Sequence, residues 1–161
     1  MKVIFSHGKE SGPWGFKIKR LAAIAEQMGC VVESVDYTDL MDPDLRVDRL
    51  LTVLEHQIEP PILVGSSMGG YVADIIGSRL GSDVLLFNPA LHSREIDPQY
   101  EYYSNGYKRT IILGTEDDVI DPELTKKLWS IHGNEAEYDE IEGMGHRTPL
   151  DVFINMYNKH V

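Results

Sequence analysis

The stretch "PILVGSSMGGYVADII", residues 61–76, decides the fold of this chain. An apolar run over residues 62–64 stops at a group of mostly small residues, and a second apolar run at helical spacing starts almost at once. Between the runs the chain reads G-x-S-x-G, from Gly65 through Ser67 to Gly69. A serine at the vertex of such an abrupt turn is typical of a nucleophile elbow, in which flanking glycines let strand and helix pass close by. A tight turn without chemistry is the alternative, whereas a phosphate-binding loop is disfavoured because no Gly-Lys-Ser/Thr follows.

The rest of the chain alternates between short apolar runs and helical patterns. The expected strands cover residues 2–7, 30–37, 62–66, 83–88, 109–114 and 135–141. The expected helices cover residues 15–29, 42–58, 121–133 and 148–160, in addition to the helix after the serine turn. This alternation predicts an α/β fold with an open, mostly parallel sheet and helices on both faces. The last of the expected strands is the most polar and is predicted to lie at an edge of the sheet.

Three of the expected helices have recognisable starts, one of them at Asp121, which precedes a proline. Asp42 precedes Pro43, which predicts an N-cap followed by the first helical residue. Thr148 also precedes a proline, and Asp151 stands where a capping box would place it. The helix that begins near Asp42 is expected to bury one apolar stripe, made of Val47, Leu50, Leu51, Leu54 and Ile58.

Length and composition indicate one ordinary globular domain over residues 1–161. A formal net charge of −11 argues against nucleic acid or an anionic membrane as the main partner. Cys30 is the single cysteine, so no intrachain disulfide can form, and we interpret it as a small buried residue. No stretch reaches the ~20 apolar residues of a membrane span, and no signal peptide is evident. We therefore expect a cytoplasmic protein without a membrane span.

A serine nucleophile needs a base, and the base needs an acid that holds it in the right tautomer. On a scaffold of this kind the acid and then the histidine follow the serine along the chain. Asp117 comes just after Gly114, at the end of the fifth expected strand, with Asp118 as its competitor. His146 follows the sixth strand in a glycine-framed loop. Each could be an ordinary surface side chain, but their order predicts Ser67 as nucleophile, Asp117 as acid and His146 as base.

The loop after the first strand is expected to complete this site. Acyl transfer builds negative charge on a carbonyl oxygen, and two backbone N–H groups usually stabilise it. We expect one of them from Met68, the residue after the nucleophile, and the other from Lys9. His7 is interpreted as a hydrogen-bonded scaffold for this loop rather than as a catalyst.

The segments "SHGKESGP", "GSSMGG", "GTEDD" and "GMGH" together resemble the α/β-hydrolase superfamily, in particular its small, nearly lidless bacterial esterase-like members. The resemblance covers essentially the whole chain, although the two N-terminal strands of larger members are missing. It implies a three-layer α/β/α sandwich with a mainly parallel six-stranded sheet in the strand order 2-1-3-4-5-6. It also implies Ser67, Asp117 and His146 as catalytic residues, Lys9 and Met68 as oxyanion-hole donors, and neither metal nor cofactor.

The long connection over residues 89–108 lies where larger members of the superfamily insert a cap, so it could act as a small lid. Its apolar and aromatic residues could line an acyl pocket or merely pack the loop onto the domain. These residues are Leu91, Ile96, Tyr100, Tyr102, Tyr103 and Tyr107.

The sequence therefore predicts a serine hydrolase that cleaves a small-molecule carboxylic ester or thioester through an acyl-enzyme. Two alternatives remain open at this stage. The same site could act on amide, lactone or C–C bonds, because fold and triad do not fix the bond that is cleaved. The chain could instead keep the hydrolase scaffold for binding, without catalysis.

Overall fold

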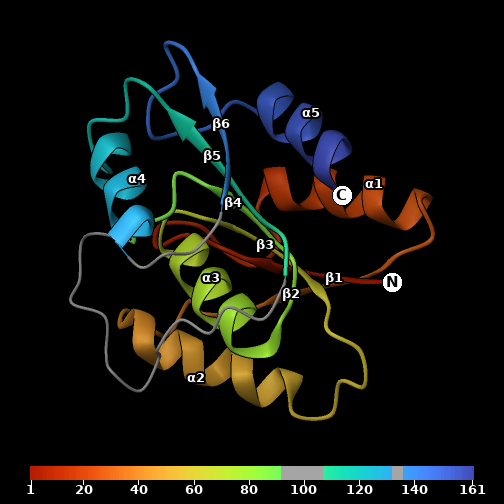
Figure 1. Cartoon of the computed structure of the whole chain (residues 1–161). Helices are drawn as coiled ribbons and strands as arrows, with labels where there is room; N and C mark the ends of the chain where they lie inside the picture. Colours follow the sequence, from red (N-terminus) through yellow and green to blue (C-terminus); the bar gives the residue numbers. More distant parts are fainter. Residues whose placement is uncertain (92–106, 132–135) are drawn as a thin grey trace.

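A computed structural model describes residues 1–91, 107–131 and 136–161, which form six strands and five helices (Figure 1). The strands are β1 (Lys2–Ser6), β2 (Val31–Val35), β3 (Ile62–Ser66), β4 (Val84–Phe87), β5 (Arg109–Gly114) and β6 (Glu137–Ile141). The helices are α1 (Phe16–Gln27), α2 (Pro43–Leu54), α3 (Met68–Leu80), α4 (Pro122–Ile131) and α5 (Leu150–His160). None of these helices has the length and hydropathy needed to span a bilayer.

The strands form one sheet in the order β2-β1-β3-β4-β5-β6, and every neighbouring pair is parallel. The α/β fold and the predicted strand order are therefore confirmed. β4 and β5 are buried along their whole length, as expected for strands covered on both faces. β6 has exposed and half-buried residues and lies at an edge, as its polar sequence predicts.

Helices cover both faces of the sheet and form two separate cores (Figure 1). Because side chains alternate along a strand, Ile4 packs against α2 and α3, whereas Phe5 packs against α1 and α5. Both side chains are almost fully buried, and this apolar burial is the main force that holds the layers together. Parallel strands place all their carboxyl ends at one edge of the sheet, where ligands gather in folds of this type.

Helix α2 begins as predicted but ends earlier than predicted. Asp42 is the N-cap, its carboxylate accepts the Asp44 N–H at 2.9 Å, and Pro43 is the first helical residue. The helix stops at Leu54, and Ile58, expected in the buried stripe, is 98% exposed. The two prolines at 60–61 explain the difference, because proline cannot donate an intrahelical hydrogen bond and disfavours a helical residue before it.

Helix α5 does not form the predicted capping box. The helix begins at Leu150 with Pro149 as N-cap, and no side chain accepts a hydrogen bond from its first turn. Thr148 lies one residue too early to cap the helix. Its hydroxyl is buried, and no hydrogen-bond partner for it exists among the described residues.

Candidate active site

Ser67 occupies a strained turn between β3 and α3. Its backbone has φ 53° and ψ −123°, a region that residues with a side chain rarely adopt. The Ser67 N–H donates to the Phe87 carbonyl at 3.0 Å, and the Ser67 carbonyl accepts the N–H groups of Tyr71 and Ala90. These three backbone hydrogen bonds tie the turn to the end of β4 and to the first turn of α3.

Gly65 and Gly69, on either side of Ser67, lie so close to neighbouring backbone atoms that no side chain fits at either position. A Cβ atom on Gly65 would lie 2.4 Å from the Gly69 carbonyl oxygen, and one on Gly69 would lie 2.0 Å from the Ser6 oxygen. Neither neighbour is a flexible side chain, so any side chain would force β1, β3 and α3 apart. The G-x-S-x-G pattern thus reflects close backbone packing around the serine.

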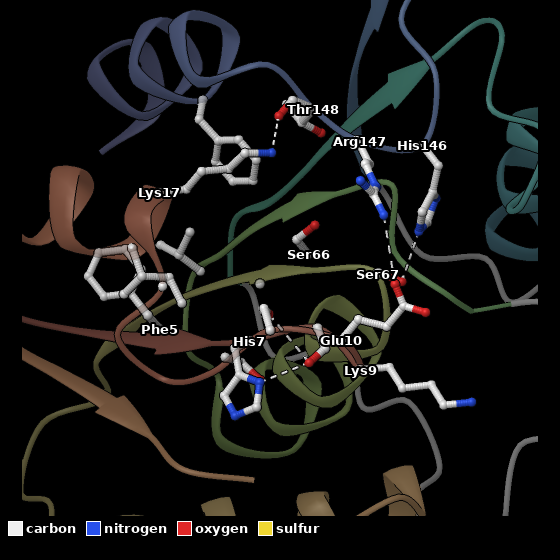
Figure 2. Close-up of a pocket in the computed structure, with 18 of the residues that line it drawn as sticks. Phe5, His7, Lys9, Glu10, Lys17, Ser66, Ser67, His146, Arg147 and Thr148 are labelled. Carbon is white, nitrogen blue, oxygen red and sulfur yellow. Dashed lines mark hydrogen bonds and ion pairs between the residues drawn. The ribbon is translucent and has the colours of Figure 1, made fainter. Parts of the chain in front are cut away.

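Ser67, His146 and Asp117 are hydrogen bonded in a row, and Figure 2 shows the contact between Ser67 and His146. Ser67 Oγ lies 3.1 Å from His146 Nε2, and His146 Nδ1 lies 2.9 Å from Asp117 Oδ2. Because the carboxylate can only accept, Nδ1 carries the proton and Nε2 presents its lone pair to the serine hydroxyl. The imidazole is 21% exposed, while the Asp117 carboxylate is 1% exposed.

The geometry distinguishes between the two aspartates that the sequence leaves as candidates. Asp117 reaches His146 with both oxygens, and its Oδ1 also accepts the N–H groups of Val119 and Ile120 at 2.9 and 2.8 Å. Asp118 is exposed and lies on the wall of the adjacent pocket. The hydrogen bonds from its own loop hold the Asp117 carboxylate in the orientation in which it binds His146.

Asn88 holds the loop that carries His146, a role that the sequence reading did not identify. Its Nδ2 donates to the carbonyls of Gly145 and His146, both at 3.1 Å, and its Oδ1 accepts the Gly114 N–H at 2.8 Å. Asn88 also has a positive φ of 42°. Asparagine tolerates this conformation better than most residues, so an Asn directly after a buried strand was the available signal.

The first-strand loop lies beside the serine. The Gly8 Cα is close enough that a Cβ atom there would lie 3.8 Å from Ser67 Cβ. Within the described residues, the backbone N–H groups of Lys9 and Met68 have no hydrogen-bond acceptor. For Met68 this follows from its place as the first residue of α3, where N–H groups have no partner inside the helix.

His7 is a structural part of this loop, as its sequence position suggested. The ring is 2% exposed. The Tyr37 N–H donates to Nε2 at 3.0 Å, so Nδ1 carries the proton and donates to the Gly8 carbonyl at 2.8 Å. Burial, with a smaller effect of the Arg46 charge, lowers the pKa of His7 below its ordinary value of 6.5. Because Nε2 accepts a hydrogen bond, the ring is neutral in this arrangement.

A pocket with a volume of about 1000 Å³ opens beside Ser67 and His146. Its apolar wall comes from strands β1 and β3 and from helices α1 and α5: Phe5, Phe16, Ile18, Leu21, Val64 and Phe153. Its charged residues are Lys9, Glu10, Lys17, Asp118 and Arg147. Within the described ranges, no group of three or more His, Cys, Asp or Glu side chains is arranged to hold a metal ion.

Lys17 contributes a partly buried cation to the far side of this pocket (Figure 2). Its ammonium donates to the Thr148 carbonyl and lies 5.1 Å from the centre of the Phe153 ring. Burial lowers the pKa of Lys17, and the neighbouring charge of Arg147 lowers it further.

The predicted substrate residues of the 89–108 connection do not line this pocket in the described part of the chain. Leu91 is fully buried in the core between the sheet and α2–α3, and Tyr107 packs against the same core. Their positions favour the packing alternative for these two residues. Tyr100 and Tyr103, with the rest of the proposed lid, lie outside the described residues. The apolar wall comes instead largely from α1, whose residues the sequence analysis did not connect with the site.

Comparison with known proteins gives the family. The model of an uncharacterised protein family, UPF0227, matches residues 2–108, which is more than half of the chain. The chain belongs to this family. A UPF0227 protein of Shewanella sp. (strain MR-7) is 27% identical over 144 residues, covering 68% of this chain and 80% of its own length.

Solved structures share the fold along the whole chain. A protein of Xanthomonas campestris pv. campestris, described as belonging to the α/β hydrolase superfamily, superposes with a TM-score of 0.74 at 23% identity and covers 98% of both chains. A structure from Nitrososphaera gargenis, reported with activity profiles of carboxylesterases, superposes with a TM-score of 0.70 at 15% identity and covers 98% of this chain and 87% of its own. At these identities the similarity establishes the α/β-hydrolase fold of the UPF0227 chain.

Proposed function

We propose that this UPF0227 protein is a serine hydrolase that cleaves a carboxylic ester or thioester through an acyl-enzyme. One observation carries the proposal. The hydroxyl of Ser67, the ring of His146 and the carboxylate of Asp117 are joined by hydrogen bonds of 3.1 and 2.9 Å at the carboxyl edge of the sheet. The Nitrososphaera structure, reported with activity profiles of carboxylesterases, has the same fold. By analogy, this similarity supports an ester as the bond that is cleaved.

The geometry supports the following sequence of steps. Ser67 Oγ attacks the carbonyl carbon of the substrate while His146 Nε2 takes the hydroxyl proton. Asp117 holds the imidazole in the tautomer that leaves Nε2 free and then stabilises the imidazolium. His146 returns the proton to the departing alcohol or thiol, so that the acyl group remains on Ser67. Water, activated in the same way, then releases the carboxylic acid and restores the serine.

Two backbone donors flank the position where the negative charge of the tetrahedral intermediate develops. The N–H groups of Lys9 and Met68 come from the loop after β1 and from the first residue of α3. The positive end of the α3 dipole adds to their effect. The pocket described above gives the acyl group an apolar wall next to Ser67, which suits a hydrocarbon acyl chain.

Labelling with a fluorophosphonate tests the proposal directly, because such a probe phosphonylates an activated serine. We expect one adduct, which peptide mass spectrometry places on Ser67 and not on the adjacent Ser66. Ser67→Ala should abolish labelling, and His146→Ala should strongly reduce it.

His160 provides a matched control, since its Nε2 is hydrogen bonded to Asp139 at 2.7 Å but no serine in the described ranges completes that pair. His160→Ala should label like the wild type. A wild-type protein whose Ser67 stays unmodified, and which hydrolyses neither esters nor thioesters, would reject catalysis in favour of a binding function.

A further inference from the structure

Arg46 is a fully buried cation on α2, with 0% of its surface exposed. Within the described residues no carboxylate lies within ion-pair distance of it. Asp39, an acid close to it in sequence, is bound by Arg49 instead, at 2.8 Å from Nη2. Burying a cation without an anionic partner is costly, so the position of Arg46 needs a physical reason.

In the part of the chain that the structure describes, every side-chain hydrogen bond of Arg46 goes to a backbone carbonyl. Nε donates to Leu40 at 2.8 Å, and Nη2 donates to Tyr37 at 3.4 Å. Nη1 donates to both His7 at 3.2 Å and Gly8 at 3.3 Å. The planar guanidinium therefore links the segment after β2 to the segment after β1, which is the loop that leads to Lys9.

His7 holds the same loop from a second direction. Its Nδ1–H donates to the Gly8 carbonyl oxygen at 2.8 Å, and its Nε2 is fixed by the Tyr37 N–H at 3.0 Å. The Gly8 carbonyl is thus bound by a neutral donor, His7, and a cationic one, Arg46, and it also accepts the Ser11 hydroxyl at 3.5 Å. Among these donors, the Arg46 guanidinium alone brings a full charge.

The orientation of the Gly8 carbonyl determines the orientation of the Lys9 N–H. The Gly8–Lys9 peptide is trans, and in a planar trans peptide the C=O and N–H bonds point in opposite directions. With its oxygen held by Arg46 and His7, this peptide turns the Lys9 N–H away from the guanidinium. The pocket wall includes Gly8, Lys9 and Ser67 but not Arg46, which favours a Lys9 N–H directed toward the pocket.

We propose that Arg46 is a positioning residue for hydrolysis at Ser67, which fixes and polarises the Gly8–Lys9 peptide so that the Lys9 N–H is an oriented oxyanion donor. A cation bound to the carbonyl oxygen draws electron density toward that oxygen and makes the N–H of the same peptide a stronger donor. Donors that are oriented before the reaction contribute most to stabilising the oxyanion. This inference rests on the proposed function of Ser67.

The Arg46→Met variant tests the inference, because methionine fills part of the space without charge or donors. Loss of one oxyanion donor lowers kcat by about 10²–10³-fold, and we expect a loss near the lower end of that range with little change in KM. Arg46→Lys keeps the charge but cannot reach all four carbonyls, so it should show a smaller loss. Arg49→Met, a substitution one turn further along α2 at a partly exposed arginine, should leave kcat unchanged.

A trifluoromethyl ketone inhibitor separates this role from simple misfolding. The ketone forms a tetrahedral oxyanion on the serine, so its Ki should rise by the same factor by which kcat/KM falls. If Arg46→Met only lowered the fraction of folded protein, kcat would fall but Ki would stay at the wild-type value. If Arg46→Met does not fold at all, Arg46→Lys provides the same comparison.

The outcomes distinguish the two proposals. A wild-type protein that is unreactive at Ser67 overturns the proposed function and this inference together. If the wild type hydrolyses the ester, and the Arg46 variants are folded and have unchanged kcat and Ki, this inference alone is overturned.

Discussion

Replacing Ser67 by glycine should make the protein inactive and, at the same time, more stable than replacing it by alanine. Ser67 has φ 53°, a conformation that costs a residue with a Cβ atom about 1–3 kcal/mol. Alanine keeps that strain and glycine removes it. Both substitutions delete the hydroxyl and its hydrogen bond to His146. The difference in stability between the two variants therefore reports the backbone contribution alone.

The expected difference follows from two opposing terms. Relief of strain contributes about 2 kcal/mol in favour of glycine. The greater freedom of glycine in the unfolded chain offsets about 0.4–1 kcal/mol of this. The Ser67→Gly variant should therefore exceed Ser67→Ala by about 1 kcal/mol, which corresponds to a rise in Tm of about 2–4 °C for a chain of this size.

Urea unfolding followed by circular dichroism measures this difference, provided that the two variants have equal m-values. Ala23→Gly is a suitable control, since Ala23 is exposed in the middle of α1 and its substitution shows the cost of glycine without any strain to relieve. That control should be destabilised by about 1 kcal/mol. If Ser67→Gly were less stable than Ser67→Ala by a similar amount, the turn would store no strain and the reasoning would be wrong.

Three further substitutions test other parts of the site. Gly69→Ala places a Cβ atom 2.0 Å from the Ser6 oxygen and should destabilise the fold by about 3 kcal/mol or more in urea unfolding, whereas Gly12→Ala, which meets nothing within 4 Å, should not. Asp117→Asn keeps the oxygen that accepts the N–H groups of its own loop but can turn an amide donor toward His146. The kcat for an ester should then fall by about 10⁴-fold while Tm changes little. A retained kcat would contradict the role assigned to Asp117. His7 has a lowered pKa in the folded state, so below pH 6.5 the unfolded chain binds a proton that the folded protein does not. Stability should therefore decrease as pH falls from 6.5 toward that lowered pKa, and a His7→Gln variant that loses stability as steeply as the wild type would exclude His7 as the cause.

The fold was predictable because its signals are local and repeat along the chain. The continuous apolar runs of β4 and β5 and the helical stripe of α2 reflect burial, and burial is periodic in sequence. The end of α2 was placed too late because the apolar spacing of Ile58 continues the stripe, although the backbone cannot continue as a helix toward two prolines. Periodicity thus identified the elements more reliably than it identified their ends.

The site was only partly predictable, for a related reason. Ser67, Asp117 and His146 each follow a strand, so the topology of the sheet places them together. Asn88 and Arg46 act through hydrogen bonds from their side chains to carbonyls 38 to 58 residues away in sequence, and such contacts leave no periodic pattern.

Arg46 nevertheless left one trace in the sequence. It stands next to Val47 and four residues before Leu50, within the apolar face of α2, and a charged residue in such a stripe must find buried partners.

The loop that carries His146 is held by its backbone rather than left free by its glycines. A Cβ atom on Gly114 would lie 2.2 Å from the Met144 oxygen, so the end of β5 packs directly against this loop. The same oxygen accepts the Glu116 N–H at 3.0 Å, and Asn88 binds the next two carbonyls. The glycines here permit close packing of backbones, as they do around Ser67. The imidazole therefore meets the serine because both are fixed to neighbouring strands, and orienting these groups before substrate binds is what makes a weak nucleophile effective.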